Sequence, residues 1–307
     1  MAITTETDRP SSPPTFWSGR RRGAGRSAVA LVVLAFAVFF ALPMGWLLLA
    51  TGKSAKQLIT AAPLSLGSLD QLAANWDALI GFQGGAIIGW LGNSALYAGA
   101  ALLITLIVSV PAGYAFALTE FRFRRAMLAL TLVVMLIPNT ALVLPIFLEL
   151  NVAGLIGNAL SVILPFSFFP FGVYLTYIYF ATSVPRDLLA AARIDGCTER
   201  QVFLRIALPL ATPVVALVAF FSFVQNWNNY FLPYVMVPSS DQYPMQVGLT
   251  GLLAATPSFN PSSVGAASVQ LPTLALATVI SVAPVVLVFL FSQRFLVAGM
   301  TAGGTKE

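Results

Sequence analysis

The chain has 307 residues, of which 58% are hydrophobic and 9% are charged, and its formal net charge is +5. Soluble domains carry about 25% charged residues, so a chain this poor in charge cannot cover itself with a polar surface, and we expect most of it to face lipid. It contains one cysteine, Cys197, and no histidine. This composition excludes an internal disulfide, a Cys/His metal site and a histidine-dependent catalytic triad. We therefore expect no enzyme, and no metal or cofactor held by this chain.

Residues 1–26 are rich in proline, serine, threonine and arginine. Such a segment does not support a packed core, so we expect a mobile N-terminal tail. The apolar run that follows, 27–50, is about 24 residues long and exceeds the apolar core of a signal peptide. We expect it to be retained as a first membrane span.

Six apolar runs reach the length of about 20 residues that a helical membrane crossing needs. We therefore predict an all-α integral membrane protein whose six transmembrane helices form one domain, 27–292. Prolines inside several runs are expected to kink the helices, and they are candidates for shaping a central cavity. The predicted spans are 27–50, 91–118, 126–148, 159–181, 209–231 and 271–292.

Lysine and arginine are distributed unevenly among the segments between these runs. Fourteen of the 16 fall in the N-terminal tail, in 119–125, in 182–208 and after residue 292, whereas two fall in 51–90. These charges lie beside apolar runs, so they report topology and not nucleic-acid binding. The positive-inside rule places both termini, including a C-terminal tail at 293–307, in the cytoplasm. We expect a multi-pass protein of a bacterial plasma (inner) membrane.

None of the six runs contains Asp, Glu, Lys, Arg or His. Proton-driven and charge-coupled carriers depend on such groups inside the membrane, so the energy source is expected to lie outside it. A carrier that binds sodium through backbone carbonyls stays possible. The segment Thr51-Gly-Lys-Ser54 is not a phosphate-binding loop, because Leu47 stands where that motif requires glycine.

Neutral polar residues gather at the end of the fifth run. Amides there could bind the hydroxyl groups of a neutral ligand while aromatic faces cover a sugar ring, although interhelical hydrogen bonding would use the same residues. Asn93 and Ser94, at the start of the second run, are expected to cap that helix. The candidate substrate-pathway residues are Gln225, Asn226, Trp227, Asn228, Asn229 and Tyr230.

The longest charged interruption, 182–208, is predicted to contain two short helices. Ser183 is expected to cap the first helix, Pro185 fits its opening turn, and Asp187 favours the positive end of its dipole. Gly196 is expected to end it. An ordinary amphipathic loop at the membrane surface would have the same pattern.

The second of these helices is predicted to begin with a capping box formed by Thr198 and Gln201. Val202, Phe203 and Ile206 give it an apolar stripe. Pro209 is expected to mark the start of the fifth span. The loop is therefore predicted to form a helix–turn–helix at the cytoplasmic face.

Several motifs of this chain resemble the permeases of type I ABC transporters, and more narrowly the carbohydrate-importer permeases of the maltose type. The likeness covers nearly the whole chain after the tail, and the combined pattern carries it. The matching residues are Asn93-Ser94, Phe121-Arg-Phe123, Ile137-Pro138, Leu144-Pro145, Pro185, Ala191-Ala-Arg-Ile-Asp-Gly196, Phe203, Leu208-Pro209, Pro213, Trp227-Asn228 and Arg294-Phe-Leu-Val-Ala-Gly299.

The resemblance implies a membrane subunit of a sugar importer. Two permease subunits, this chain and a homologous one, would form the pathway, and an extracellular or periplasmic sugar-binding protein would deliver the solute. Two cytoplasmic ATPase subunits would bind ATP and magnesium and would each receive a coupling helix. In this chain that helix would be 188–195, and the ATPase-coupling residues would be Asp187, Leu188, Ala191, Ala192, Arg193, Asp195 and Gly196.

This chain departs from the family pattern at one position. The family motif usually has glutamate where this chain has Ala190, and that glutamate is thought to pair with a basic residue of the ATPase. Asp187, three residues earlier on the same helical face, is a candidate substitute. Three alternatives remain at this point: the same machine carrying another solute such as a glycerol phosphodiester, a sodium-coupled carrier, and a membrane scaffold without transport activity.

Overall fold

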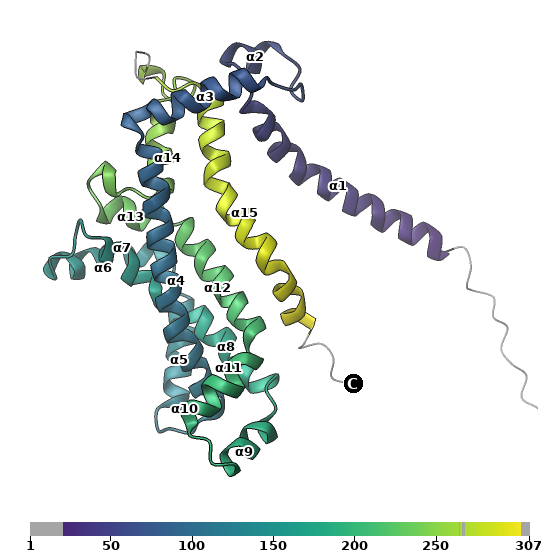
Figure 1. Cartoon of the computed structure of the whole chain (residues 1–307), viewed down its shortest axis with the longest axis vertical. Coiled ribbons are helices and arrows are strands. Elements are labelled where there is room, and N and C mark those ends of the chain that lie inside the picture. Colours follow the sequence, from purple (N-terminus) through teal and green to yellow (C-terminus); the bar gives the residue numbers. More distant parts are fainter. Residues whose placement is uncertain (1–20, 264, 266–267, 302–307) are drawn as a thin grey trace, which may run out of the picture.

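The structure, a computed structural model, describes residues 21–263, 265 and 268–301, and within these ranges it is helical and has no strand. The predicted all-helical class is therefore confirmed. Residues 1–20 of the predicted N-terminal tail and 302–307 of the C-terminal tail lie outside the described residues. The helices form an elongated bundle, with α3 at one end and α9 at the other (Figure 1).

Four helical segments are long and apolar enough to cross a membrane. They are helix α1 (Arg21–Ala50), helix α4 (Ala86–Leu118), the segment Ala159–Thr182 and helix α15 (Leu271–Thr301). The segment Ala159–Thr182 consists of α7 (Ala159–Ser167) and α8 (Pro170–Thr182). Two further pairs of helices pass the same test only when each bent pair is taken together, so the described residues contain four to six candidate spans.

The third predicted span consists of two helices, and the bend between them is sharper than the expected proline kink. Helix α5 (Arg124–Met135) and helix α6 (Asn139–Val152) meet at 106°. Pro138 explains the break, because it has no N–H to donate and it disfavours helical geometry at the residue before it. The last turn of α5 accordingly closes with 3₁₀-type hydrogen bonds, which join residues three apart. They run from Leu136 N to Val133 O and from Ile137 N to Val134 O, both at 3.1 Å.

The fifth predicted span is also bent, just after Pro209. Pro209 lies inside the short helix α11 (Leu208–Leu210), and helix α12 (Thr212–Trp227) begins only after Ala211. The helical segment Glu199–Leu210 meets α12 at 77°. The two segments reach the length of a membrane crossing only when they are taken together.

Helix α4 is the central element of the bundle, and it packs against α7, α8 and α12. It approaches α8 closely at Gly113, where a Cβ atom would lie 2.0 Å from Oγ1 of Thr176. In contrast, α1 extends away from the bundle (Figure 1), and its residues 26–44 are all exposed. A helix that is apolar all round and unburied needs lipid or another chain around it.

The elements at the α3 end are held to α4 by side chains spaced two helical turns apart. Trp90 Nε1 donates to Ser240 O at 3.1 Å, and Tyr97 Oη donates to Gln242 O at 3.0 Å. These contacts fix the chain before helix α14 (Met245–Ala254). The other elements at this end are α2 (Ala55–Thr60), α3 (Leu69–Gly81), η1 (Phe82–Gly84), η3 (Ser240–Gln242) and η4 (Pro261–Ser263), and α13 (Phe231–Met236) follows α12.

Asn93 and Ser94 do not cap the second span, so that prediction is wrong. Helix α4 begins at Ala86, which places both residues in its interior. Asn93 Nδ2 donates to Asp241 O at 2.7 Å, and Ser94 Oγ accepts from Met245 N at 2.7 Å. Ser94 thus satisfies the first backbone N–H of α14, a donor that has no partner within its own helix.

Candidate functional site

The loop predicted to couple to an ATPase contains the two short helices expected from the sequence. The first is α9 (Arg186–Ile194), and Pro185 occupies its N-cap position without a side-chain hydrogen bond. Ser183 instead ends α8, where its N–H donates to Tyr179 O at 2.8 Å. The prediction that Ser183 caps α9 is therefore wrong, because Ser183 is the C-cap of α8 and Pro185 holds the N-cap position of α9.

Gly196 ends α9 as predicted. Its φ is +84°, a conformation that costs glycine little and other residues more. Gly196 N donates to Arg193 O at 3.1 Å and Cys197 N donates to Ala192 O at 3.0 Å, which is the pattern of a Schellman motif. A Cβ atom at Gly196 would meet no atom within 4 Å, so the requirement for glycine comes from the backbone alone.

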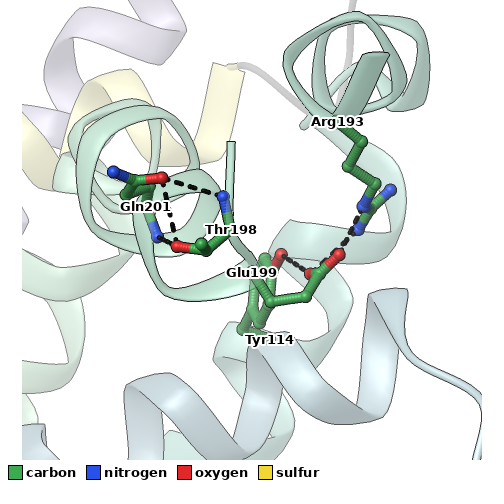
Figure 2. Close-up of polar contacts among 5 residues, drawn as sticks. All are labelled: Tyr114, Arg193, Thr198, Glu199 and Gln201. Carbon is green, nitrogen blue, oxygen red and sulfur yellow. Dashed lines mark hydrogen bonds and ion pairs between the residues drawn. The ribbon is translucent and has the colours of Figure 1, made fainter. Parts of the chain in front are cut away.

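The second helix begins with the predicted capping box (Figure 2). Thr198 N donates to Gln201 Oε1 at 2.8 Å, and Gln201 N donates to Thr198 Oγ1 at 3.4 Å. This helix, α10 (Glu199–Val202), continues through a π-helical turn (Phe203–Ala207) into α11. Val202 is fully buried, and the Phe203 ring lies 5.0 Å from the ring of Tyr114 on α4. The predicted apolar stripe therefore fastens this helix to the bundle.

One polar contact at this site was missed by the sequence analysis. Arg193 Nε donates to Glu199 Oε1 at 2.6 Å and its Nη2 donates to Glu199 Oε2 at 3.2 Å, while Tyr114 Oη lies 3.5 Å from Oε2 (Figure 2). Hydrogen bonding from Arg193 lowers the pKa of Glu199, and the same bond raises the pKa of Arg193. One indication of this ion pair is present in the sequence, namely that Arg193 and Glu199 carry opposite charges and lie on either side of Gly196.

Helix α9 has two distinct faces. Leu189 and Ala192 are buried against the bundle, so Ala192 supports the helix and does not present a free surface. Leu188 is 47% exposed and Ile194 is 85% exposed. The other predicted coupling residues, Asp187, Ala191, Arg193, Asp195 and Gly196, are all exposed.

The exposed face of α9 suits close contact with another protein. Asp187, Ala190, Ala191 and Ile194 follow the helical spacing of one face. The short side chains of the two alanines let another chain approach this face closely. Ile194 adds an exposed apolar side chain at the C-terminal end of α9.

The candidate substrate-pathway residues do not converge on one point. Trp227 is buried and its Nε1 donates to Ser281 O on α15 at 3.0 Å, so it joins two helices. Asn226 Nδ2 donates to Ser222 O in its own helix at 2.9 Å. Asn228 Oδ1 lies 3.5 Å from Gln246 Nε2. Asn229 N donates to Asn226 O at 3.3 Å, and Tyr230 stacks on the ring of Tyr234 at 5.4 Å.

Gln225 alone of the six lines the cavity that lies at two helix breaks. The cavity has a volume of about 320 Å³. Its walls come from the break between α5 and α6, from the break between α7 and α8, and from α12. The lining residues are Val134, Met135, Ile137, Asn139, Leu142, Ile146, Pro165, Phe166, Phe168, Phe169, Pro170, Phe171 and Gln225. Aromatic rings with two amides suit a neutral, hydroxyl-bearing ring.

Buried hydroxyl groups stabilise the wall of this cavity. Thr105 Oγ1 donates to Ser167 O at 2.8 Å, and Ser109 Oγ lies 3.5 Å from Phe169 O. Ser222 Oγ, on α12, donates to Thr105 Oγ1 at 3.1 Å. The backbone carbonyls that lose their helical partners at the break before Pro170 thus accept hydrogen bonds from side chains of α4. Such partners are what a broken helix needs inside a membrane.

Comparisons with known proteins place these features in a family context. The family described as binding-protein-dependent transport system inner membrane component matches residues 109–302. The arabinooligosaccharides transport system permease protein AraQ of Bacillus subtilis (strain 168) is 31% identical over 92% of this chain and 96% of that protein. AraQ of Halalkalibacterium halodurans is 35% identical over 71% of this chain and 74% of that protein.

Further similarities extend over most of the chain. The diacetylchitobiose uptake system permease protein NgcG of Streptomyces coelicolor is 29% identical over 94% of this chain and 90% of that protein. A chain in the crystal structure of a bacterial ABC transporter that imports the acidic polysaccharide alginate has a TM-score of 0.78, at 21% identity, over 92% of this chain and 100% of that chain. At that identity the structural likeness shows a shared fold.

Proposed function

The chain belongs to the family of binding-protein-dependent transport system inner membrane components, and on this premise we propose that it is the permease subunit of an ATP-driven sugar importer. It forms half of the translocation pathway and works with a separate ATPase. Family membership over 109–302 is the observation that carries this conclusion. The relatives AraQ and NgcG, named for the transport of oligosaccharides, support sugar as the solute class.

Six crossings follow when each bent pair of helices counts as one span. The loop 182–208 then lies in the cytoplasm together with both termini, as the distribution of lysine and arginine favours. The α3 end of the bundle faces the outside, and the elements α2, α3 and α14 are available there to a sugar-binding protein. Helix α9, at the opposite end (Figure 1), is available to the ATPase.

Helix α9 is the coupling helix in this proposal. Its exposed face is formed by Asp187, Ala190, Ala191 and Ile194, and the cognate ATPase covers it. ATP and magnesium are bound by that ATPase and not by this chain. Asp187 takes the place of the missing glutamate at position 190; an Asp187→Asn variant with unchanged ATPase binding and transport would refute this assignment.

A second, homologous permease completes the pathway. The exposed residues 26–44 of α1 are consistent with a complex in which lipid and the second subunit surround this helix. The proposed complex contains two permeases and two ATPase subunits, as the resemblance to type I ABC-transporter permeases implies.

The solute passes the cavity at the two helix breaks, where Gln225 provides hydrogen bonds and Phe168 and Phe169 provide ring faces. No lysine or arginine is among the lining residues, which favours a neutral sugar over a glycerol phosphodiester, because a phosphate group would call for basic residues. Family membership does not favour the sodium-coupled carrier.

Purification from native membranes in mild detergent tests this proposal. The expected result is a stable complex of this chain with an ATPase and a second permease. A lone oligomer that retains transport activity would contradict the proposal. Binding of a sugar panel to the cognate binding protein would then identify the solute.

A further inference from the structure

A second cavity, distinct from the proposed sugar pathway, lies at the α9 end of the bundle. It has a volume of about 180 Å³. Three arginines line it, one from α5 and two from α9, together with one acidic residue. The lining residues are Ala117, Leu118, Glu120, Arg124, Arg186, Leu189 and Arg193.

Two of the three guanidinium groups lack an acidic partner. Arg193 is paired with Glu199, and this is the one ion pair within the part of the chain that the structure describes. Arg124 Nη2 reaches only Ala117 O, at 3.5 Å. Arg186 and Glu120 are exposed and belong to no ion pair there. The cavity therefore carries a net positive charge that the protein itself does not neutralise.

The position of the cavity relates it to the membrane surface. Ala117 and Leu118 are the last residues of the spanning helix α4, and Arg124 is the first residue of α5. From Arg124, α5 continues with the exposed apolar side chains Met127 and Leu130, which are 50% and 62% exposed. An acyl chain lying along α5 would therefore place its headgroup beside Arg124.

We propose that this cavity binds the phosphodiester headgroup of an anionic phospholipid, with Arg124 and Arg186 as its ligands. Guanidinium groups bind phosphate oxygens with paired hydrogen bonds. Basic pockets between helices at the cytoplasmic face suit such headgroups. The bound lipid would join α5 to α9 and so stabilise the position of the proposed coupling helix. This site adds to the proposed function and does not depend on the identity of the transported solute.

The test measures binding of phosphatidylglycerol to the purified full chain in phosphatidylcholine nanodiscs, by native mass spectrometry and by the shift in unfolding temperature. The Arg124→Gln/Arg186→Gln variant is expected to bind phosphatidylglycerol about 30-fold more weakly, because it removes the charge-assisted hydrogen bonds of two guanidinium groups to the phosphate. Arg124→Lys/Arg186→Lys should show an intermediate loss, since lysine keeps the charge but not the paired geometry.

The matched control is Arg122→Gln/Arg200→Gln, which removes one arginine from each of the same two loops but no residue that lines the cavity. The two double variants therefore have the same number of cytoplasmic basic residues. This control should bind phosphatidylglycerol like the parent. An equal loss in both double variants would reduce the effect to general surface charge and overturn the proposal. If inorganic phosphate raised the unfolding temperature as much as phosphatidylglycerol does, the cavity would be a site for free anions, and the lipid proposal would be overturned. Unchanged phosphatidylglycerol binding in the Arg124→Gln/Arg186→Gln variant would also overturn the proposal.

Discussion

The Nε atom of Arg193 donates to the Oε1 atom of Glu199 at 2.6 Å, across the turn that Gly196 makes between α9 and α10. Glu199 also lies within 3.5 Å of the Tyr114 hydroxyl on α4 (Figure 2). This contact joins the end of the proposed coupling helix to its neighbour and to the central helix of the bundle. It sets the direction in which α9 projects.

The Arg193–Glu199 contact should weaken at acid pH. The pKa of Glu199 is lowered in the folded chain, so the contact stabilises the loop fully above the ordinary carboxyl pKa and loses its effect as the pH falls through the lowered value. Both side chains are largely exposed, so the contribution is about 0–1 kcal/mol. Hydrogen-exchange protection factors of the α9 amides should fall over this range in the parent. They should show no such step in Glu199→Gln; an identical step there would exclude Glu199 as its source.

Replacing Gly196 should impair coupling more than membrane insertion. Valine at a φ of +84° costs about 1–2 kcal/mol of backbone strain, and no neighbouring atom is displaced. Gly196→Asn is the matched control, because asparagine tolerates this conformation better. We expect sugar-stimulated ATP hydrolysis by the complex to fall with valine and to be largely retained with asparagine, at equal amounts in the membrane. Loss of insertion in the valine variant would instead give Gly196 a role in folding.

The packing of α14 against α4 should depend on one of two neighbouring glycines. A Cβ atom at Gly248 would lie 2.1 Å from the ring of Trp90, whereas one at Gly251 would meet nothing within 4 Å. Gly248→Ala is therefore expected to lower the free energy of unfolding by about 1–3 kcal/mol. Gly251→Ala should be neutral or stabilise the chain by up to about 1 kcal/mol. Thermal unfolding in detergent measures both, and equal unfolding temperatures would contradict the described packing.

Gln225 and Trp227 should separate solute binding from stability. Gln225→Leu removes an amide from the cavity wall and should reduce sugar uptake while leaving the unfolding temperature nearly unchanged. Trp227→Phe removes the donor to Ser281 O, and the loss of this buried interhelical hydrogen bond should cost about 0.5–1.5 kcal/mol. Uptake and thermal unfolding are measured for both variants. A stability loss in Gln225→Leu equal to that in Trp227→Phe would give Gln225 a structural role.

The parts of the loop that the sequence predicted correctly are those determined by local hydrogen bonds. Gly196, Thr198 and Gln201 act within a few residues of their partners, so their spacing alone was informative. Ser183 was assigned to the wrong helix because the sequence does not tell which of two adjacent helix ends a serine belongs to.

The features that the sequence did not predict depend on distant residues. Asn93 and Ser94 bind the chain near Asp241 and Met245, about 150 positions away. The break at Pro138 was expected only as a kink, because whether a proline bends or ends a helix depends on what surrounds the released backbone groups. The position of Gln225 at a cavity likewise required the two helix breaks to be placed together in space.

The most direct test of the proposed function is uptake of labelled oligosaccharide by proteoliposomes that contain this chain, its homologous permease, the ATPase and the binding protein. We predict uptake that requires ATP, continues in the presence of sodium and proton ionophores, and is lost when the ATPase is omitted. Uptake by this chain alone that collapses with a sodium ionophore would contradict the account.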